Sequence, residues 1–291
     1  MMKERIIKLL LSSLAVVVIA SVIIGCQDES TNNIESITVS GSSALLPLME
    51  KSIEKFNEKN PYAEISAQAG GSGTGLAQVL NGAVDIGNSD MSAEDKLDKA
   101  NAQKLVDHKV IAQGFGVVVN KSLGIDNLTS SQIRDIFAGE ITNWKTVGGP
   151  NKEILLIHRT AGSGTRATFE KTILGGDKSL ENDSIGVTQD SNGAVLSVIK
   201  SNDGAISYLS LVYMSTEEAK KLLSVLKIDS VASDKVNICD GSYKFWSWGH
   251  MYTRGEPTGL AKEFVEFVSS VDNNSSVESL GFISAAEMKV K

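Results

Sequence analysis

The chain has 291 residues, of which 22% are charged, and a formal net charge of −7. This length fits one large or two small domains, and an acidic chain lacks the basic face that nucleic-acid binding requires. The three histidines show no metal-ligand spacing such as HExxH, so we expect no metal site. Beyond Cys26 only Cys239 remains, so an intramolecular disulfide is excluded and the fold relies on its core.

The first 25 residues have the pattern of a secretory signal. A basic start, MMKERIIK, precedes an uncharged apolar run that ends in Ile-Ile-Gly before Cys26. This ending resembles a bacterial lipobox and predicts that Cys26 becomes the lipid-modified first residue of the mature chain, followed by a polar tether to residue 36. The alternative is an uncleaved membrane anchor, for which the run is only marginally long. Residues 1–25 carry a net +2, so the expected mature chain carries −9.

Strands alternate with helices along the rest of the chain, which predicts mostly parallel sheets of the α/β class. Apolar residues that alternate with polar ones predict strands, and apolar residues three or four positions apart predict helices. In chain order we expect a strand at 35–43, a helix at 44–60, a strand at 63–69, a helix after the loop 70–75, a strand at 84–87, a long strand at 108–120 that crosses between domains, a helix and turn within 130–144, a strand at 153–159, a helix and strand within 193–209, and a strand, turn and helix within 249–270.

Three Gly/Ser loops each follow an expected strand and open an expected helix: 41–43, 71–75 and 162–165. The first amides of a helix have no internal partner and lie at the positive end of its dipole, so they bind anions. Serine and threonine add hydroxyl donors. The alternative is that these hydroxyls only cap helices. Three such loops in one chain favour an anion site.

Arg159 ends the expected strand just before the third loop and is the predicted counter-charge, because a guanidinium donates two parallel bonds to one oxyanion. Arg166 is the rival cation, but it lies inside the expected helix. Asp90 is unexpected beside an anion. It either caps the helix that follows or accepts a proton that the ligand carries. Near neutral pH phosphate carries such a proton and sulfate does not, so Asp90 would select phosphate.

Together these segments resemble the PstS-like phosphate-binding lipoproteins of Pst-type ABC transporters. The resemblance covers nearly the whole mature chain and rests on VSGSSALLPL, QAGGSGTGLAQVLNGAVDIGNSD, HRTAGSGTRATFE and YTRGEPTGLAKEFVEF. It implies a type II periplasmic-binding-protein-like fold, in which two α/β lobes with mostly parallel sheets are joined by a hinge of crossing strands. We expect lobe I at 37–113 plus 250–291 and lobe II at 114–249.

The resemblance also implies the contacts to phosphate. From the first lobe these are Ser43, the amides of Ala44 and Leu45, Ser72 and Asp90; from the second lobe they are Arg159, Ser163, Gly164 and Thr165. The chain departs from the family at two places. Leu45-Leu46 stands where some members carry Thr-Phe, and Ala161 stands where some carry an aspartate that pairs with the arginine.

A member of this family would be a monomeric, non-enzymatic binding protein without a cofactor. It would be anchored to the membrane by lipid on Cys26, face the extracytoplasmic side, and deliver inorganic phosphate to the permease subunits of an ABC transporter. Four alternatives stay open: a protein for another oxyanion (sulfate, molybdate or tungstate), a phosphate-ester hydrolase, a sensor or adhesion lipoprotein, and a dinucleotide enzyme. The last rests on a single G-x-G-x-x-A match over 162–167, which is a weak signal.

Overall fold

A computed structural model describes residues 35–290 of the chain. The predicted signal, the lipobox with Cys26 and most of the tether lie outside the described residues. Within them the fold is a mixed α/β structure of two lobes, as the sequence predicts. No helix in this part of the chain is both long and apolar enough to cross a bilayer.

A ten-stranded sheet runs through the structure, and the strands β1, β2 and β3 pair in parallel, as do β6, β7 and β8. Strands β12 and β9 pair with β4 outside the main order, and β10 pairs with β5 in a separate ribbon. The main order is β2 (Glu64–Ala69), β1 (Ser36–Gly41), β3 (Ile86–Ser89), β11 (Trp246–Arg254), β4 (Leu105–Asn120), β8 (Ala205–Ser210), β6 (Leu155–Arg159) and β7 (Val187–Gln189), and the remaining strands are β5 (Asn127–Leu128), β9 (Leu223–Val225), β10 (Lys227–Ile228) and β12 (Ile283–Ser284).

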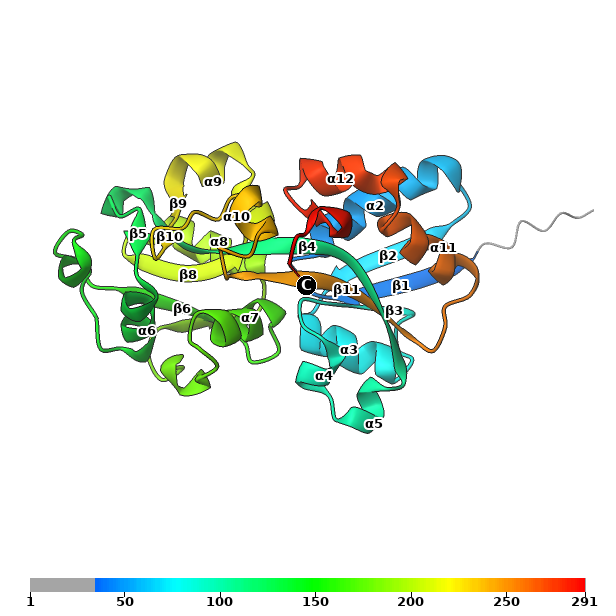
Figure 1. Ribbon diagram of the computed structural model, residues 1–291, viewed down its shortest axis with the longest axis horizontal. Coiled ribbons are helices and arrows are strands. Elements are labelled where there is room, and N and C mark those ends of the chain that lie inside the picture. Colours follow the sequence, from blue (N-terminus) through cyan, green and yellow to red (C-terminus); the bar gives the residue numbers. More distant parts are fainter. Residues whose placement is uncertain (1–34, 291) are drawn as a thin grey trace, which may run out of the picture. The chain divides into compact units, whose positions relative to one another are not determined.

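Strand β4 connects the two groups of parallel strands and changes its partner on the way. From Leu105 to Gly114 it pairs antiparallel with β11, and from Phe115 to Val119 it pairs antiparallel with β8. Figure 1 shows β4 and β11 side by side between the two groups of helices. The long strand expected at 108–120 therefore forms and crosses between the groups, starting three residues earlier than predicted.

Local sequence explains most helix boundaries. Helix α6 begins with a capping box, in which Thr129 and Gln132 bond each other's backbone N–H. The helices are α2 (Leu46–Lys59), α3 (Ser72–Leu80), α4 (Ala93–Lys96), α5 (Lys99–Ala102), α6 (Ser130–Ala138), α7 (Gly164–Thr172), α8 (Asn192–Ser201), α9 (Glu217–Leu222), α10 (Lys235–Cys239), α11 (Gly259–Val268) and α12 (Asn274–Ser279), with 3₁₀ turns η1 (Lys121–Leu123), η2 (Trp144–Val147), η3 (Lys178–Leu180), η4 (Leu211–Met214), η5 (Val271–Asn273) and η6 (Ala285–Glu287).

Two large apolar clusters form the core, one on each side of the partner change in β4. One packs α2 and α11 on β1 and β3 and includes Phe56, whose ring contacts Phe264 edge-on at 5.7 Å between ring centroids. The other surrounds Phe169, whose ring stacks on Tyr208 at 4.1 Å. Each group of parallel strands thus packs on its own apolar cluster. The two clusters hold in place the strand ends that carry predicted site residues.

Candidate functional site

The three predicted loops meet where the two lobes touch. The 71–75 loop and the 162–165 loop are joined by a backbone bond from Gly73 N to Gly162 O of 2.9 Å. Gly71 has φ +85°, a left-handed value that favours glycine and turns the chain into α3. Helices α3 and α7 therefore begin close to each other, and the first-turn amide of Gly73 in α3 is directed toward the loop that opens α7.

Asp90 lies at the centre of this contact and is 3% exposed. Its Oδ1 accepts from Ser42 Oγ at 2.5 Å and from Gln113 Nε2 at 2.8 Å, and its Oδ2 accepts from Thr165 Oγ1 of the other lobe at 3.4 Å. The prediction that Asp90 caps the next helix is wrong. Ser92 caps α4, with its hydroxyl accepting from Asp95 N at 3.2 Å.

Two opposing effects act on the ionisation of Asp90. Burial raises the pKa of its carboxyl above the ordinary value, because the charged form loses its hydration. The bonds from Ser42 and Gln113 and the positive charge of Arg159 act in the opposite direction. The net pKa is raised, so the ionised form of Asp90 depends on these donors.

Arg159 ends β6 and is the buried cation of the site, with 1% of its surface exposed. Its Nη2 donates to Asp190 O at 3.0 Å and lies 3.5 Å from Ser43 Oγ of the opposite lobe. Its Nε and Nη1 are buried without a hydrogen-bond partner among residues 35–290. Burial lowers the pKa of Arg159, yet a guanidinium stays charged in proteins. Two donors of this cation are thus available to a ligand.

Arg166, the rival cation, is fully engaged within its own lobe. It forms a two-bond pair with Asp183, at 2.8 and 2.9 Å, and donates to Glu170 at 2.8 Å. It also donates to the carbonyl oxygen of Arg159 at 2.7 Å. Arg166 therefore supports the end of the strand that carries Arg159.

Ser43 is the point where the first loop meets the second lobe. Its Oγ accepts from the backbone N and the side-chain Nδ2 of Asn192, at 3.1 and 3.0 Å. Since its acceptor positions are filled, its own proton is free to donate to an anion. Its carbonyl oxygen accepts from Tyr213 at 2.7 Å. The sequence reasoning did not name Asn192, although DSNGAVL repeats the pattern of a polar loop that opens a helix, here α8.

The remaining predicted residues lie around Asp90 and Arg159. Ser72 Oγ accepts from Asp90 N at 3.0 Å, which leaves its proton free. Ser163 caps α7 by accepting from Arg166 N at 3.2 Å, and its contact with an anion stays a prediction. The amides of Ala44 and Leu45 point to Ser42 Oγ, at 3.0 and 3.4 Å. These two amides have a partner inside the chain, and their contact with an anion stays a prediction.

Gly164 marks how closely the lobes approach each other. A Cβ at this position would lie 2.2 Å from Ser72 Oγ and 2.8 Å from Asp90 Cβ, both in the opposite lobe. We therefore predict that Gly164→Ala holds the lobes apart and weakens anion binding by about 1–3 kcal/mol, the usual cost of overpacking. Gly162→Ala is the matched control, because its added Cβ would meet nothing within 4 Å. Calorimetric titration of both variants checks this, and equal affinities would contradict it.

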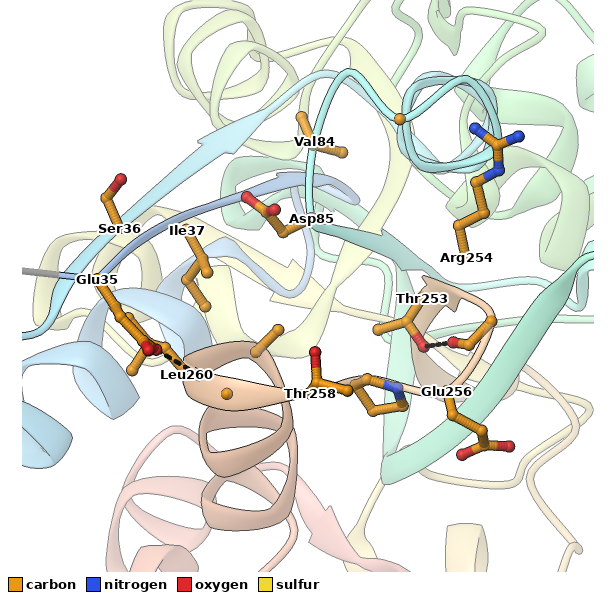
Figure 2. Close-up of a pocket in the computed structure, with 15 residues that line it drawn as sticks. Glu35, Ser36, Ile37, Val84, Asp85, Thr253, Arg254, Glu256, Thr258 and Leu260 are labelled. Atoms are coloured by element: carbon orange, nitrogen blue, oxygen red, sulfur yellow. Dashed lines mark hydrogen bonds between the residues drawn. The ribbon is translucent and has the colours of Figure 1, made fainter. Parts of the chain in front are cut away.

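A hollow of about 490 Å³ lies at the start of β1 and the end of β11, away from the contact around Asp90, and does not suit an anion. Figure 2 shows Glu35 reaching Leu260, whose N–H donates to its carboxylate at 2.9 Å. The N-terminus of α11 is thus already occupied by a negative charge. Asp85 and Glu256 line the same hollow and add further negative charge.

The chain matches known proteins along most of its length. Residues 27–272 match the model of a PBP superfamily domain. The chain is 44% identical over 256 residues to the phosphate-binding protein PstS of Bacillus subtilis, a match that covers 88% of this chain and 82% of that protein. It is 24% identical to PstS of Borreliella burgdorferi over 90% of this chain and 94% of that one.

Two solved structures resemble the fold. A substrate-binding protein from Clostridium perfringens, assigned to a phosphate ABC transporter and holding phosphate, superposes with a TM-score of 0.78 at 27% identity and covers 86% of this chain and 100% of its own. An ABC-type phosphate transport receptor from Vibrio cholerae superposes with a TM-score of 0.66 at 26% identity, over 85% and 99%. The chain thus belongs to the PBP superfamily and, within it, to the family of PstS phosphate-binding proteins.

Proposed function

We propose that this protein captures inorganic phosphate between its two lobes for delivery to an ABC-type importer. The observation that carries this proposal is the buried Arg159, whose Nε and Nη1 have no partner among the described residues. A buried charged group without a partner is costly, and an oxyanion with two oxygens toward the guanidinium would satisfy both donors. The hydroxyl protons of Ser43 and Ser72 and the first amides of α7 supply further donors around it.

Asp90 decides which oxyanion this site accepts. Among the described residues, its Oδ2 has only the 3.4 Å contact with Thr165, so it can accept one more hydrogen bond. Monohydrogen phosphate offers a proton there, whereas sulfate offers only oxygen lone pairs against a carboxylate. The pairing with sulfate would leave a buried acceptor without a donor and add charge repulsion, so the site excludes sulfate.

The testing experiment is a titration of the purified protein with phosphate and with sulfate. Trp246 and Trp248 lie on β11 beside the partner change in β4, with ring centroids 5.6 Å apart, and serve as fluorescence reporters of lobe movement. We expect a saturable change with phosphate at neutral pH and almost none with equal sulfate. Comparable responses to both anions would favour a general oxyanion-binding protein and sink the selectivity argument.

No catalytic step is assigned to the protein. The proposed site contains donors for an anion and one carboxylate, and its relatives are named for phosphate binding. A hydrolase would turn over a chromogenic phosphate ester, with or without added metal ions. We expect no turnover in either case.

The remaining assignments complete the proposal. We assign residues 37–113 plus 250–291 to lobe I and 114–249 to lobe II, in agreement with the change of β4 from β11 to β8 after Gly114. We further propose that Cys26 carries a lipid anchor, that the lobes face the extracytoplasmic side, and that permease subunits bind both lobes together. Mass spectrometry of the membrane-extracted protein would detect the lipid on Cys26.

A further inference from the structure

Gln113 is a buried amide within the buried, otherwise apolar part of β4 between Val110 and Val119. It lies on β4, one residue before the change of partner, and is 1% exposed. Its Nε2 donates to Asp90 Oδ1 at 2.8 Å, while its Oε1 is buried without a hydrogen-bond partner in the described part of the chain. A buried amide with an unsatisfied oxygen destabilises the fold by about 1–3 kcal/mol. The hydrogen bond from Gln113 to Asp90 offsets part of this destabilisation.

Ser42 acts on the same carboxylate oxygen. Its Oγ accepts from Ala44 N at 3.0 Å, which turns its single proton toward Asp90 Oδ1 at 2.5 Å. Oδ1 therefore receives two donors from its own lobe. Oδ2 faces the other lobe, and within the described part of the chain its one hydrogen bond is the long contact with Thr165. The two oxygens of Asp90 are thus chemically distinct.

We propose that Gln113, together with Ser42, sets the anion selectivity of the site by keeping Asp90 an ionised acceptor whose free oxygen is Oδ2. Neither residue is among the predicted ligand contacts, so both act as positioning residues. The inference rests on the proposed phosphate site and names the groups that make its carboxylate selective.

The proton balance explains why these donors matter. If Asp90 takes up a proton, the proton goes to Oδ2, because Oδ1 already accepts two. The carboxyl then donates to a ligand oxygen, and sulfate becomes acceptable. Arg159 on β6 favours the ionised form of Asp90, and the phenol of Tyr213 on η4, whose pKa burial raises to about 12, stays neutral over the pH range tested. The hollow that Asp90 lines also holds Glu94, Asp95, Asp107, Lys109 and His250, of which His250 pairs with Asp107 at 2.7 Å.

The test compares phosphate and sulfate affinities of the wild type and Gln113→Met by calorimetry between pH 5 and 9. Sulfate binding should take up one proton, so sulfate affinity should fall about tenfold per pH unit above the pKa of Asp90. Without the bond from Gln113, we expect this fall to begin about one to two pH units higher, the equivalent of one charge-assisted hydrogen bond. Phosphate affinity should change far less, because phosphate can donate or accept at Oδ2.

Gln78→Met is the matched control, since Gln78 lies on α3 of the same lobe and is not among the donors to Asp90. Ser42→Ala is the second variant, which should shift the sulfate profile in the same direction even if Gln113→Met fails to fold. Folding is checked by circular dichroism.

Two results separate failure of the inference from failure of the proposed function. If the folded variants change both affinities equally and leave the sulfate profile where it is in the wild type, the role of Gln113 is overturned. If the wild type does not bind phosphate at all, the proposed site itself is wrong.

Discussion

Replacing Arg159 with methionine should nearly abolish phosphate binding. Arg159 is the buried cation of the site, and two of its three guanidinium nitrogens have no hydrogen-bond partner within residues 35–290. Removing one partner of a buried, hydrogen-bonded charge pair costs about 2–5 kcal/mol, which corresponds to a roughly 30-fold to several-thousand-fold loss of affinity. Calorimetric titration with phosphate at pH 7 measures this loss directly.

The matched control is Arg134→Met on α6 of the same lobe. Arg134 donates to Ile173 O at 3.1 Å and belongs to none of the contacts around Asp90. The phosphate affinity of the Arg134→Met variant should stay within about twofold of the wild type, because Arg134 shares no partner with the site. A similar loss in both variants would mean that general positive charge, rather than the buried guanidinium, holds the anion.

Asp90→Asn should weaken phosphate binding and admit sulfate. A site that bonds a ligand's hydroxyl rejects the analogue without it by about 10⁴–10⁵. In the variant, the asparagine amide can donate to a sulfate oxygen, and the charge that repels sulfate is gone. We expect the preference for phosphate to fall by about one to two orders of magnitude, because one charge-assisted bond is worth about 1.5–3 kcal/mol. Paired titrations with both anions measure the ratio.

Asp95→Asn on α4 is the control for this variant, since Asp95 is an exposed carboxylate near Asp90 that pairs with Lys171.

The stability of the Asp90→Asn variant without ligand provides a second check. Because the pKa of Asp90 is raised by burial, its contribution to stability is present below the unfolded value of 3.8 and is lost as pH rises through the folded pKa. Asp90→Asn should therefore not lower the melting temperature at pH 7. An unchanged anion preference would remove Asp90 from the mechanism.

The sequence predicted what local chemistry determines. The Gly/Ser loops, the end of β6 at Arg159 and the apolar face of α11 follow from residues close in the chain. The degree of burial within that face is set by the tertiary structure: the side chain of Val265 is buried, and that of Phe267 is only partly buried. The strand expected from Val84 begins at Ile86, although Asp85 already bonds β1, with its N–H donating to Thr38 O at 3.1 Å and its carboxylate accepting from Thr38 N at 2.8 Å.

The sequence did not reveal partners that lie far apart along the chain. Ser43 and Asn192 are 149 residues apart and bond across the lobes. Gln113 lies 23 residues from Asp90, and the two side chains bond although β11 lies between β3 and β4 in the sheet. A lone glutamine in a run of buried apolar residues was the available signal, since buried polar groups require partners. Which partner it finds depends on strand order, and strand order is not encoded locally.

The exchange of partners along β4 has a mechanical consequence. The ladder with β11 ends at Gly114 and the ladder with β8 starts at Phe115, so only one peptide link along this strand is shared by both. A change in the backbone dihedral angles of Gly114 and Phe115 would alter the angle between the ladders at the cost of the single bond from Phe115 N to Phe245 O. Sliding would instead break the bonds of a whole ladder. As a joint, the strand would thus be soft in bending and stiff in translation, so a movement of the lobes would leave the loop ends in register.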